Sequence, residues 1–272
     1  QIKLFFMHRD NFDFDWDYFS GNNSPTRHVA ISSNGDYIHA RGYIFSSDSN
    51  VPISQSNGIP CGPGGLSADG KYLASCGGQK IHLYDMDGLI WSYETGDDVV
   101  ATAISADGEY IVGGSEDEKV YLFHRDSNSP LWSYDAGGDV ISISISADGE
   151  YIFAGTASGS EYAGVYFFDK DNSTPLWSDE LSGNRVRTVA NSSDGEYAAA
   201  GTDDNSVYVF DKEGDYWAYA TGDDIWSVAI SSDGEYIVAG SWNNKVYLFD
   251  KDVVTPLWNF ECYGSTGGIY SV

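Results

Sequence analysis

One six-residue phrase recurs along the chain, and this internal repeat constrains the fold more than any other feature of the sequence. The copies read SSNGDY, SADGKY, SADGEY, SADGEY, SSDGEY and SSDGEY, at residues 32–37, 67–72, 105–110, 146–151, 192–197 and 231–236. The glycines of successive copies are separated by 35, 38, 41, 46 and 39 residues. Self-similarity at this period indicates supersecondary units that stack against one another.

Each repeat contains four short runs with the character of β-strands. In the last repeat they are IWSVAIS (225–231), EYIVAGS (235–241), KVYLFD (245–250) and PLWNFE (256–261). Apolar residues alternate with small or polar ones, and Val, Ile, Tyr and Phe are abundant, which favours strands over helices. Asp or Asn followed by Gly supplies two residues that tolerate positive φ. We therefore expect a tight hairpin at the hexamer, with its Tyr packed against the neighbouring repeat.

Four antiparallel strands per repeat predict a β-propeller, whose blades stack around an axis because no blade buries both faces alone. A tryptophan recurs at one position of the fourth strand, and we interpret it as a packing wedge between blades rather than a ligand site. The residues at this position are Trp16, Trp91, Trp132, Trp177, Trp217 and Trp258, with Ile53 in an irregular repeat.

Two known repeat families resemble this chain. The pattern SxDGEYIVAGS…KVYLFD resembles the WD repeat, with Phe-Asp at 210–211 and 249–250 in place of Trp-Asp. The pattern VYLFDKD…TPLWSYxTGDD resembles the quinoprotein-like repeat, whose outer strand carries a tryptophan. These resemblances cover nearly the whole chain and imply the propeller fold far more than a function. The repeat sequence is also similar to that of repeat propellers in archaeal surface proteins.

The chain departs from both families at residues that carry their special properties. TGDD (95–98 and 221–224) replaces the Gly-His pair of WD repeats, so the His-centred polar network of that family is absent. The adjacent-cysteine motif of the quinoprotein enzymes is missing too. We therefore expect no bound quinone and no other cofactor.

The two termini supply parts of one further blade. IKLFFMHRD (2–10) and FDFDWDYFSGN (12–22) match a third and a fourth strand, and GGIYSV (267–272) matches the start of a first strand. We predict one domain over residues 1–272: an all-β, seven-bladed propeller with six complete four-stranded blades and a seventh closed by both termini, from about 1–22 plus 267–272. The alternatives are six or eight blades. Nothing matches a second strand for the closing blade, so either that blade is thin or the natural chain continues past Val272.

The charge balance is strongly acidic, with 41 Asp and Glu against 14 Lys and Arg and a formal net charge of −27. Nucleic acids and anionic membrane surfaces both require clustered basic residues, so neither is an expected partner. No run approaches the roughly 18 apolar residues of a membrane-spanning helix, so we expect no direct membrane insertion. With the archaeal likeness, this composition favours an extracellular or cell-surface protein; a cytoplasmic one is the alternative.

The chain has three cysteines, Cys61, Cys76 and Cys262, and no Cys/His spacing typical of zinc. Cys61 and Cys76 lie symmetrically about the turn at 67–70, so a regular hairpin places them opposite one another. A cross-strand disulfide between them is geometrically feasible. We favour two reduced, buried thiols over that disulfide.

No constellation in the sequence indicates catalysis. The five histidines are scattered among different repeats, no GxSxG elbow occurs, and carboxylate pairs are too frequent to single out one. DKDNST (169–174) and DMDG (85–88) resemble calcium loops only in part, because the Glu that ends the twelve-residue pattern is missing. We expect no catalytic residue and no metal ligand.

The candidate site lies where the repeats disagree. Five residues before each hexamer, at one mouth of the central channel, the side chain varies between Arg, aliphatic and aromatic types. Trp242 falls in a loop that opens on the same face. Exposed Trp, Tyr and Arg are enriched in binding hot spots. The predicted partner-binding residues are Arg27, Arg185, Arg187, Trp226, Trp242 and Tyr270. The alternative is that Trp226 only plugs its own channel.

The sequence thus favours a non-enzymatic binding or scaffold propeller that presents a rim to a protein or a glycan. It would act as a monomer or as a module of a larger surface or secreted chain. Two alternatives stay open. One is a propeller hydrolase or lactonase with a metal in the channel, and the other is a purely architectural module of a longer surface protein.

Overall fold

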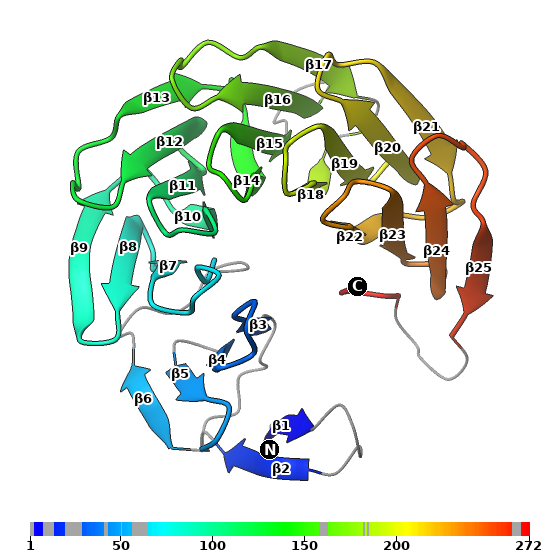
Figure 1. Ribbon diagram of the computed structural model, residues 1–272. Coiled ribbons are helices and arrows are strands. Elements are labelled where there is room, and N and C mark those ends of the chain that lie inside the picture. The colour runs from blue at the N-terminus through cyan, green and yellow to red at the C-terminus, as the bar shows by residue number, and fades with distance from the viewer. Residues whose placement is uncertain are drawn as a thin grey trace.

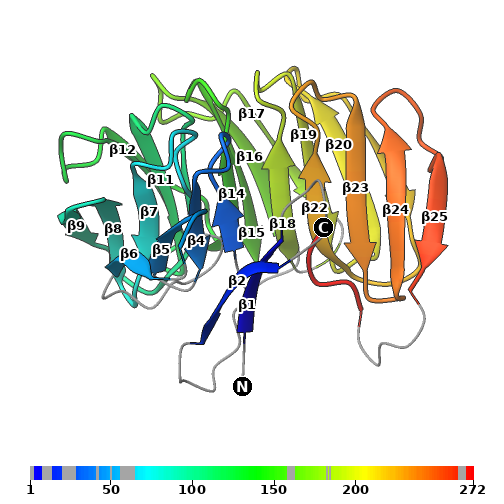
Figure 2. The same cartoon turned by 60° about the horizontal axis from the view of Figure 1, so that its bottom comes forward.

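The chain folds into an arc of small antiparallel sheets around a central axis. The computed structural model describes residues 3–7, 14–19, 29–40, 43–49, 51–55, 65–157, 163–181, 183, 185–262 and 268–272. Every regular element in these ranges is a strand, from β1 to β25. The described residues contain no helix that is long and apolar enough to span a bilayer. The sheets follow one another around the arc in chain order (Figure 1), and their strands stand side by side (Figure 2).

Five sheets have four strands each, and their order in the sheet is their order in the chain. They are β3–β6 (Val29–Ile31, Tyr37–Ala40, Tyr43–Ser46, Pro52–Gln55), β10–β13 (Val99–Ile104, Tyr110–Ser115, Lys119–His124, Trp132–Asp135), β14–β17 (Asp139–Ile145, Tyr151–Ala157, Ala163–Asp169, Trp177–Leu181), β18–β21 (Val186–Asn191, Tyr197–Thr202, Ser206–Asp211, Tyr216–Ala220) and β22–β25 (Ile225–Ile230, Tyr236–Ser241, Lys245–Asp250, Trp258–Glu261). Two smaller sheets are β7–β9 (Leu73–Cys76, Lys80–Asp85, Gly88–Glu94) and β1–β2 (Lys3–Met7, Phe14–Phe19).

Within the described residues the sheet β7–β9 has three strands. Before β7, Leu66 forms an isolated bridge with Leu73, and the Gly65 carbonyl accepts the Ala74 N–H at 2.9 Å. Residues 56–64, which precede this bridge in the chain, lie outside the described residues.

The apolar cores lie between consecutive sheets. One buried cluster joins Phe153 and Phe167 of β14–β17 to Val186, Val189 and Phe210 of β18–β21. Corresponding clusters join β10–β13 to β14–β17, and β18–β21 to β22–β25. Each sheet therefore needs its neighbour to bury its face, as expected for stacked blades.

The hexamer forms the turn between the first and second strands of a sheet. Gly108 N–H donates to the Ser105 carbonyl at 2.9 Å, and Gly108 has a φ of 73°, whereas Asp107 keeps a negative φ. The prediction that both the Asp and the Gly of the hexamer adopt positive φ is therefore wrong. The Asp107 carboxylate instead accepts the Ser105 hydroxyl at 2.6 Å and the Glu109 N–H at 2.9 Å, while the Ser105 Oγ accepts the Tyr110 N–H at 3.0 Å. Asp acts here as a side-chain acceptor that fixes the turn.

The Tyr of each hexamer packs on the turn glycine of the next one, which confirms the predicted contact between repeats. A β-carbon added at Gly149 would lie 2.6 Å from Cδ2 of Tyr110, and one at Gly108 would lie 2.6 Å from Cδ2 of Tyr72. Glycine thus serves both the positive φ and the close approach of the ring.

The recurring tryptophan also joins neighbouring sheets. Four indole Nε1–H groups donate to backbone carbonyls of the following sheet at 2.7–2.8 Å: Trp91 to Arg125, Trp132 to Lys170, Trp177 to Lys212 and Trp217 to Lys251. This confirms the interpretation of these side chains as packing wedges. Trp258 of β25, at the end of the arc, is 49% exposed and makes no such bond to the described residues.

From β14 onward, a branched side chain of the inner strand packs on a glycine of the sheet before it. A β-carbon added at Gly155 would lie 2.5 Å from a methyl group of Val186, and one at Gly201 would lie 2.4 Å from a methyl group of Ile225. Real β-carbons do not approach this closely, so these second strands require glycine where the next blade docks. Before β10, Cys76 occupies the equivalent position and packs with Val99.

Residues 268–272 occupy the place of an inner strand beyond β22–β25. Ile269 lies against Gly240, where an added β-carbon would be 2.7 Å from its Cγ2. The N–H of Val272 donates to the Ser227 hydroxyl at 3.1 Å. Both contacts repeat those of the preceding inner strands, so the alignment of this segment with a first strand is correct in space.

The structure does not show the predicted closure of a seventh blade. Within the described ranges no pairing joins residues 268–272 to β1 or β2, and these two strands pair only with each other. The arc is open between β1–β2 and the red end of the chain (Figure 1).

The cysteines differ from the favoured interpretation. Cys76 is disulfide-bonded and Cys262 is a free thiol. The expectation of a reduced thiol is therefore wrong for Cys76. Cys61, the partner considered from the sequence, lies outside the described residues.

We expect Gly149→Ala to lower the free energy of unfolding by roughly 2–4 kcal/mol, because the new methyl group is strained at a φ of 79° and also overlaps Tyr110. The matched control is Gly137→Ala, where φ is 69° and nothing lies within 4 Å. This variant should lower the free energy of unfolding by only about 1 kcal/mol, the cost of the strained φ. Urea unfolding measures both, and equal losses would contradict the role given to the tyrosine contact.

Candidate functional site

Two kinds of loop lie at the same end of the arc: the loops that lead into the inner strands and the loops between second and third strands. The Trp242 N–H donates to the Asp224 carbonyl at 2.8 Å, and the Glu116 N–H donates to the Asp98 carbonyl at 2.8 Å. Trp242 and Glu116 therefore occupy equivalent places in two blades. We call this end of the channel the mouth; the hexamer turns lie at the opposite end, because successive strands run antiparallel.

Three aromatic side chains pack together at the mouth. The ring centroid of Trp226 is 5.3 Å from that of Trp242 and 5.4 Å from that of Tyr270, and Trp242 and Tyr270 are also 5.4 Å apart. Trp242 is 39% exposed and Tyr270 is 58% exposed. We call these three residues the aromatic cluster. They come from β22, from the loop after β23, and from the C-terminal segment, so the fold unites residues 44 positions apart (226 and 270).

Arg187 of β18 lies between the aromatic cluster and a carboxylate. Its Cζ is 4.5 Å from the ring centre of Trp226, and its Nη2 donates to Asp224 Oδ2 at 2.8 Å. Both partners of this ion pair are mostly buried, with 19% and 29% of their side chains exposed. A guanidinium held by a ring face and a carboxylate is strongly oriented. The sequence did not predict Asp224 as the partner; its place after Asp223 in the second TGDD was the available signal.

Of the other predicted site residues, the structure describes Arg185. Arg185 is exposed, and its backbone N–H donates to Asp203 Oδ1 at 3.1 Å. Arg27 lies outside the described residues. The structure thus brings together Arg187, Trp226, Trp242 and Tyr270 of the predicted set.

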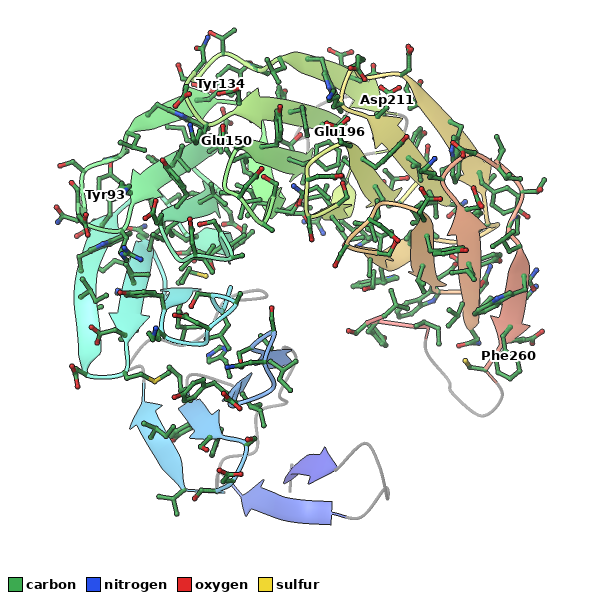
Figure 3. The ribbon with its side chains drawn as sticks, viewed as in Figure 1. Tyr93, Tyr134, Glu150, Glu196, Asp211 and Phe260 are labelled. Carbon is green, nitrogen blue, oxygen red and sulfur yellow. The ribbon has the colours of Figure 1, made fainter. Side chains whose placement is uncertain are left out.

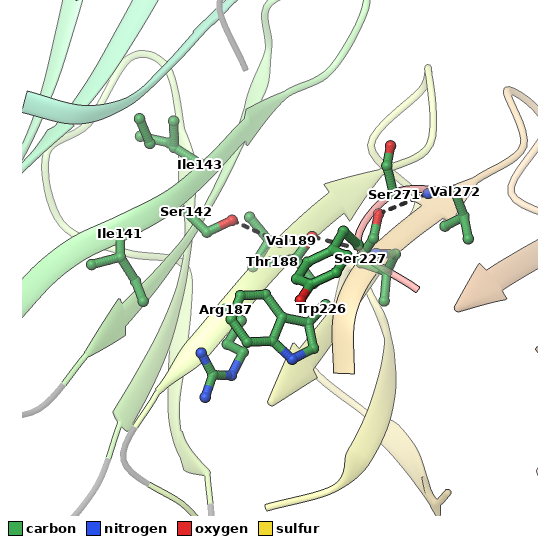
Figure 4. Close-up of a pocket in the computed structure, with 13 residues that line it drawn as sticks. Ile141, Ser142, Ile143, Arg187, Thr188, Val189, Trp226, Ser227, Ser271 and Val272 are labelled. Atoms are coloured by element: carbon green, nitrogen blue, oxygen red, sulfur yellow. Dashed lines mark hydrogen bonds between the residues drawn. The ribbon is translucent and has the colours of Figure 1, made fainter. Parts of the chain in front are cut away.

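A cavity of about 320 Å³ opens beside the cluster in the central channel (Figure 4). Its wall is built from the inner strands β10, β14, β18 and β22 and from the C-terminal segment. Three hydroxyls in this wall accept N–H groups of the next inner strand: Ser142 from Val189, Thr188 from Val228 and Ser227 from Val272. These hydroxyls hold neighbouring blades in register, which the sequence did not reveal.

The mouth is acidic at the loop after β11, and the sheets β14–β17 and β18–β21 lie between this loop and the aromatic cluster. Partial burial raises the pKa of the Glu116 carboxyl, the carboxylates of Asp139, Asp98 and Asp97 raise it further, and Arg185 opposes the shift. These groups therefore lie close enough to repel one another. In the part of the chain that the structure describes, no three His, Cys, Asp or Glu residues gather as a metal site.

Comparisons with known proteins agree on the architecture. A profile of the family described as "Outer membrane protein assembly factor BamB" matches residues 45–260. The β-propeller domain of Myceliophteria thermophila Cps50 (Swd1) superimposes with a TM-score of 0.68 at 16% sequence identity, over 87% of this chain and 86% of that one. At this identity the likeness shows the fold alone. No curated protein matches the sequence.

We expect Glu116→Gln to raise the free energy of unfolding slightly at neutral pH. Because the folded state raises the pKa of this carboxyl, the stability linked to its protonated form is present at low pH and is lost as the pH rises through that pKa. The gain of the variant should vanish below about pH 4, where glutamic acid is also protonated in the unfolded chain. Thermal unfolding at pH 7 and at low pH measures this, and a less stable variant at pH 7 would contradict it.

Proposed function

The chain belongs to the family of the outer membrane protein assembly factor BamB, and we propose that it is a non-catalytic propeller that binds a partner protein at its mouth. The aromatic cluster carries this proposal. Trp242 and Tyr270 expose large aromatic surfaces at a place where the repeat is irregular, and aromatic side chains of this kind dominate binding hot spots. Loops and irregular positions on a rigid repeat scaffold commonly carry binding.

Two observations support a protein rather than a glycan or a substrate. The family description is that of an assembly factor. In addition, the hydroxyls nearest the cavity accept N–H groups between blades, and Nη2 of Arg187 is paired with Asp224, so these atoms have structural partners. The proposal that the protein works outside the cytoplasm is supported by the disulfide at Cys76 and by the net charge of −27.

We further propose that β1–β2 close the ring against β22–β25. The two N-terminal strands have the register of a third and a fourth strand, since Phe6 pairs with Trp16 as Leu248 pairs with Trp258. The C-terminal segment already fills the inner position of the same blade. At the outer side, Trp258 and Phe260 are 49% and 61% exposed (Figure 3), which leaves an apolar face for the closing strands.

The test of partner binding replaces the exposed aromatics of the cluster. Immobilised wild-type protein should retain a partner from a lysate of the source cells, and the double variant Trp242→Ala/Tyr270→Ala should retain at least about tenfold less, because hot-spot residues carry most of the binding energy. Quantitative mass spectrometry of the retained proteins gives the readout. Tyr216→Ala removes a ring that is 50% exposed on the outer strand β21 and serves as the control. Equal retention by all three proteins would refute the site.

The test of closure compares two equivalent tryptophans. Trp132→Phe removes a hydrogen bond to the Lys170 carbonyl and should cost about 1–2 kcal/mol of unfolding free energy. If the ring closes, Trp258→Phe loses the corresponding bond to the N-terminal strands and costs a similar amount. A Trp258→Phe variant as stable as wild type would show an open ring. Tyr216→Phe, which removes an exposed hydroxyl on β21, is the control.

A further inference from the structure

We infer that the partner segment held at the mouth is basic, with arginine side chains that stack on the aromatic cluster and pair with carboxylates beside it. This inference rests on the proposed function and adds the chemical class of the partner. It follows from how the chain distributes its few cations, from what surrounds the cluster, and from the way the chain already holds one of its own guanidinium groups there.

Four basic side chains of the blades are neutralised at the end opposite the mouth. There, a Lys or Arg of the turn between third and fourth strands faces a Glu of the hexamer turn in the same sheet (Figure 3 labels Glu150 and Glu196). The pairs are Arg125–Glu109, Lys170–Glu150, Lys212–Glu196 and Lys251–Glu235, at 4.0, 3.3, 2.6 and 3.7 Å. At the mouth end, the cations Lys80, Lys119, Lys245, Arg185 and Arg187 are outnumbered by the carboxylates of the loops there, among them Asp97, Asp98, Glu116, Asp117, Asp203, Asp204, Asp223 and Asp224.

The mouth keeps an excess of negative charge. At the loop after β11, Asp98, Asp139 and Glu116 lie close enough to repel one another, and Arg185 opposes this repulsion. Beside the aromatic cluster itself, the carboxylates are Asp223 and Asp224. Charges of this kind act over about 8 Å at physiological salt, so they favour a cation at the mouth itself rather than anywhere on the surface. A partner that brings positive charge relieves the repulsion, and an acidic partner increases it.

Arg187 shows how this place accommodates a guanidinium group. It stacks on the face of Trp226 at 4.5 Å and pairs with Asp224 at 2.8 Å, so one ring and one carboxylate hold it together. Trp242 and Tyr270 offer further ring surface that is open to solvent. Asp223 lies next to Asp224 and uses Oδ1 to accept the Asp224 N–H at 3.0 Å. A partner arginine at the exposed rings therefore finds the same two elements, an aromatic face and a nearby carboxylate.

The position of Trp242 in the repeat strengthens this inference. Its N–H bonds the carbonyl of Asp224 as the N–H of Glu116 bonds Asp98 and the N–H of Asp203 bonds Arg185. The equivalent positions thus carry carboxylates in two blades and an indole in the third. A ring set into a row of acidic side chains is suited to a cation rather than to an apolar or neutral group.

The test uses three labelled probes: a hexa-arginine peptide, a hexa-glutamate peptide and the neutral oligosaccharide maltohexaose. Fluorescence anisotropy at about 0.15 M NaCl measures their affinity for the wild-type chain, for Trp242→Ala/Tyr270→Ala and for the control Tyr216→Ala. Circular dichroism melts establish that the variants fold. We expect hexa-arginine to bind the wild type and the control equally, and to bind the double variant at least about fivefold more weakly.

The other outcomes separate this inference from the proposed function. Hexa-arginine that binds the double variant as tightly as the wild type overturns the inference, because the attraction is then a diffuse effect of net charge. If the binding of hexa-glutamate or maltohexaose depends on the aromatic cluster and the binding of hexa-arginine does not, the inference is also overturned. In that case the cluster remains a binding site. If no probe depends on the cluster, the inference fails, and retention of the lysate partner decides the proposed function independently.

Discussion

From β14 onward, the structure depends on the contact between a branched side chain of the inner strand and a glycine of the sheet before it. Val186 on Gly155 and Ile225 on Gly201 bring the two backbones so close that no side chain fits at the glycine. Because a single four-stranded sheet cannot bury both faces, this contact creates the apolar core between blades. Two further contacts stabilise the same interface. The Tyr of one hexamer packs on the turn glycine of the next, and an indole N–H donates to a carbonyl of the next sheet.

This interface explains why the chain repeats so closely and where the repetition ends. Positions that touch the neighbouring blade are held to one residue type, and their identity carries no information about a ligand. The inner-strand position at the mouth touches no neighbouring glycine and is free to vary: Ile141 in β14, Arg187 in β18, Trp226 in β22 and Tyr270 beyond β25. The last three come together with Trp242 and Asp224. The site is therefore made of residues that the packing of blades does not require.

The sequence predicted the features that arise from periodicity. The four strands of each repeat, the role of Trp91, Trp132, Trp177 and Trp217, and the place of residues 268–272 all follow from aligning the repeats. Features that depend on one local competition were not predicted. Asp107 keeps a negative φ, and its carboxylate accepts the Ser105 hydroxyl. The Arg187–Asp224 ion pair joins two neighbouring blades, so it depends on how the blades are placed and cannot be inferred from one repeat.

The central claim is that the mouth binds and the remaining tryptophans pack. Indole N–H resonances test it directly, because four tryptophans donate to the next sheet and two others lie at the mouth. On titration with the hexa-arginine peptide, the account predicts that the signals of Trp226 and Trp242 shift, while those of Trp91, Trp132, Trp177 and Trp217 stay in place. Shifts among the four bonded indoles, with Trp226 and Trp242 unchanged, would contradict it.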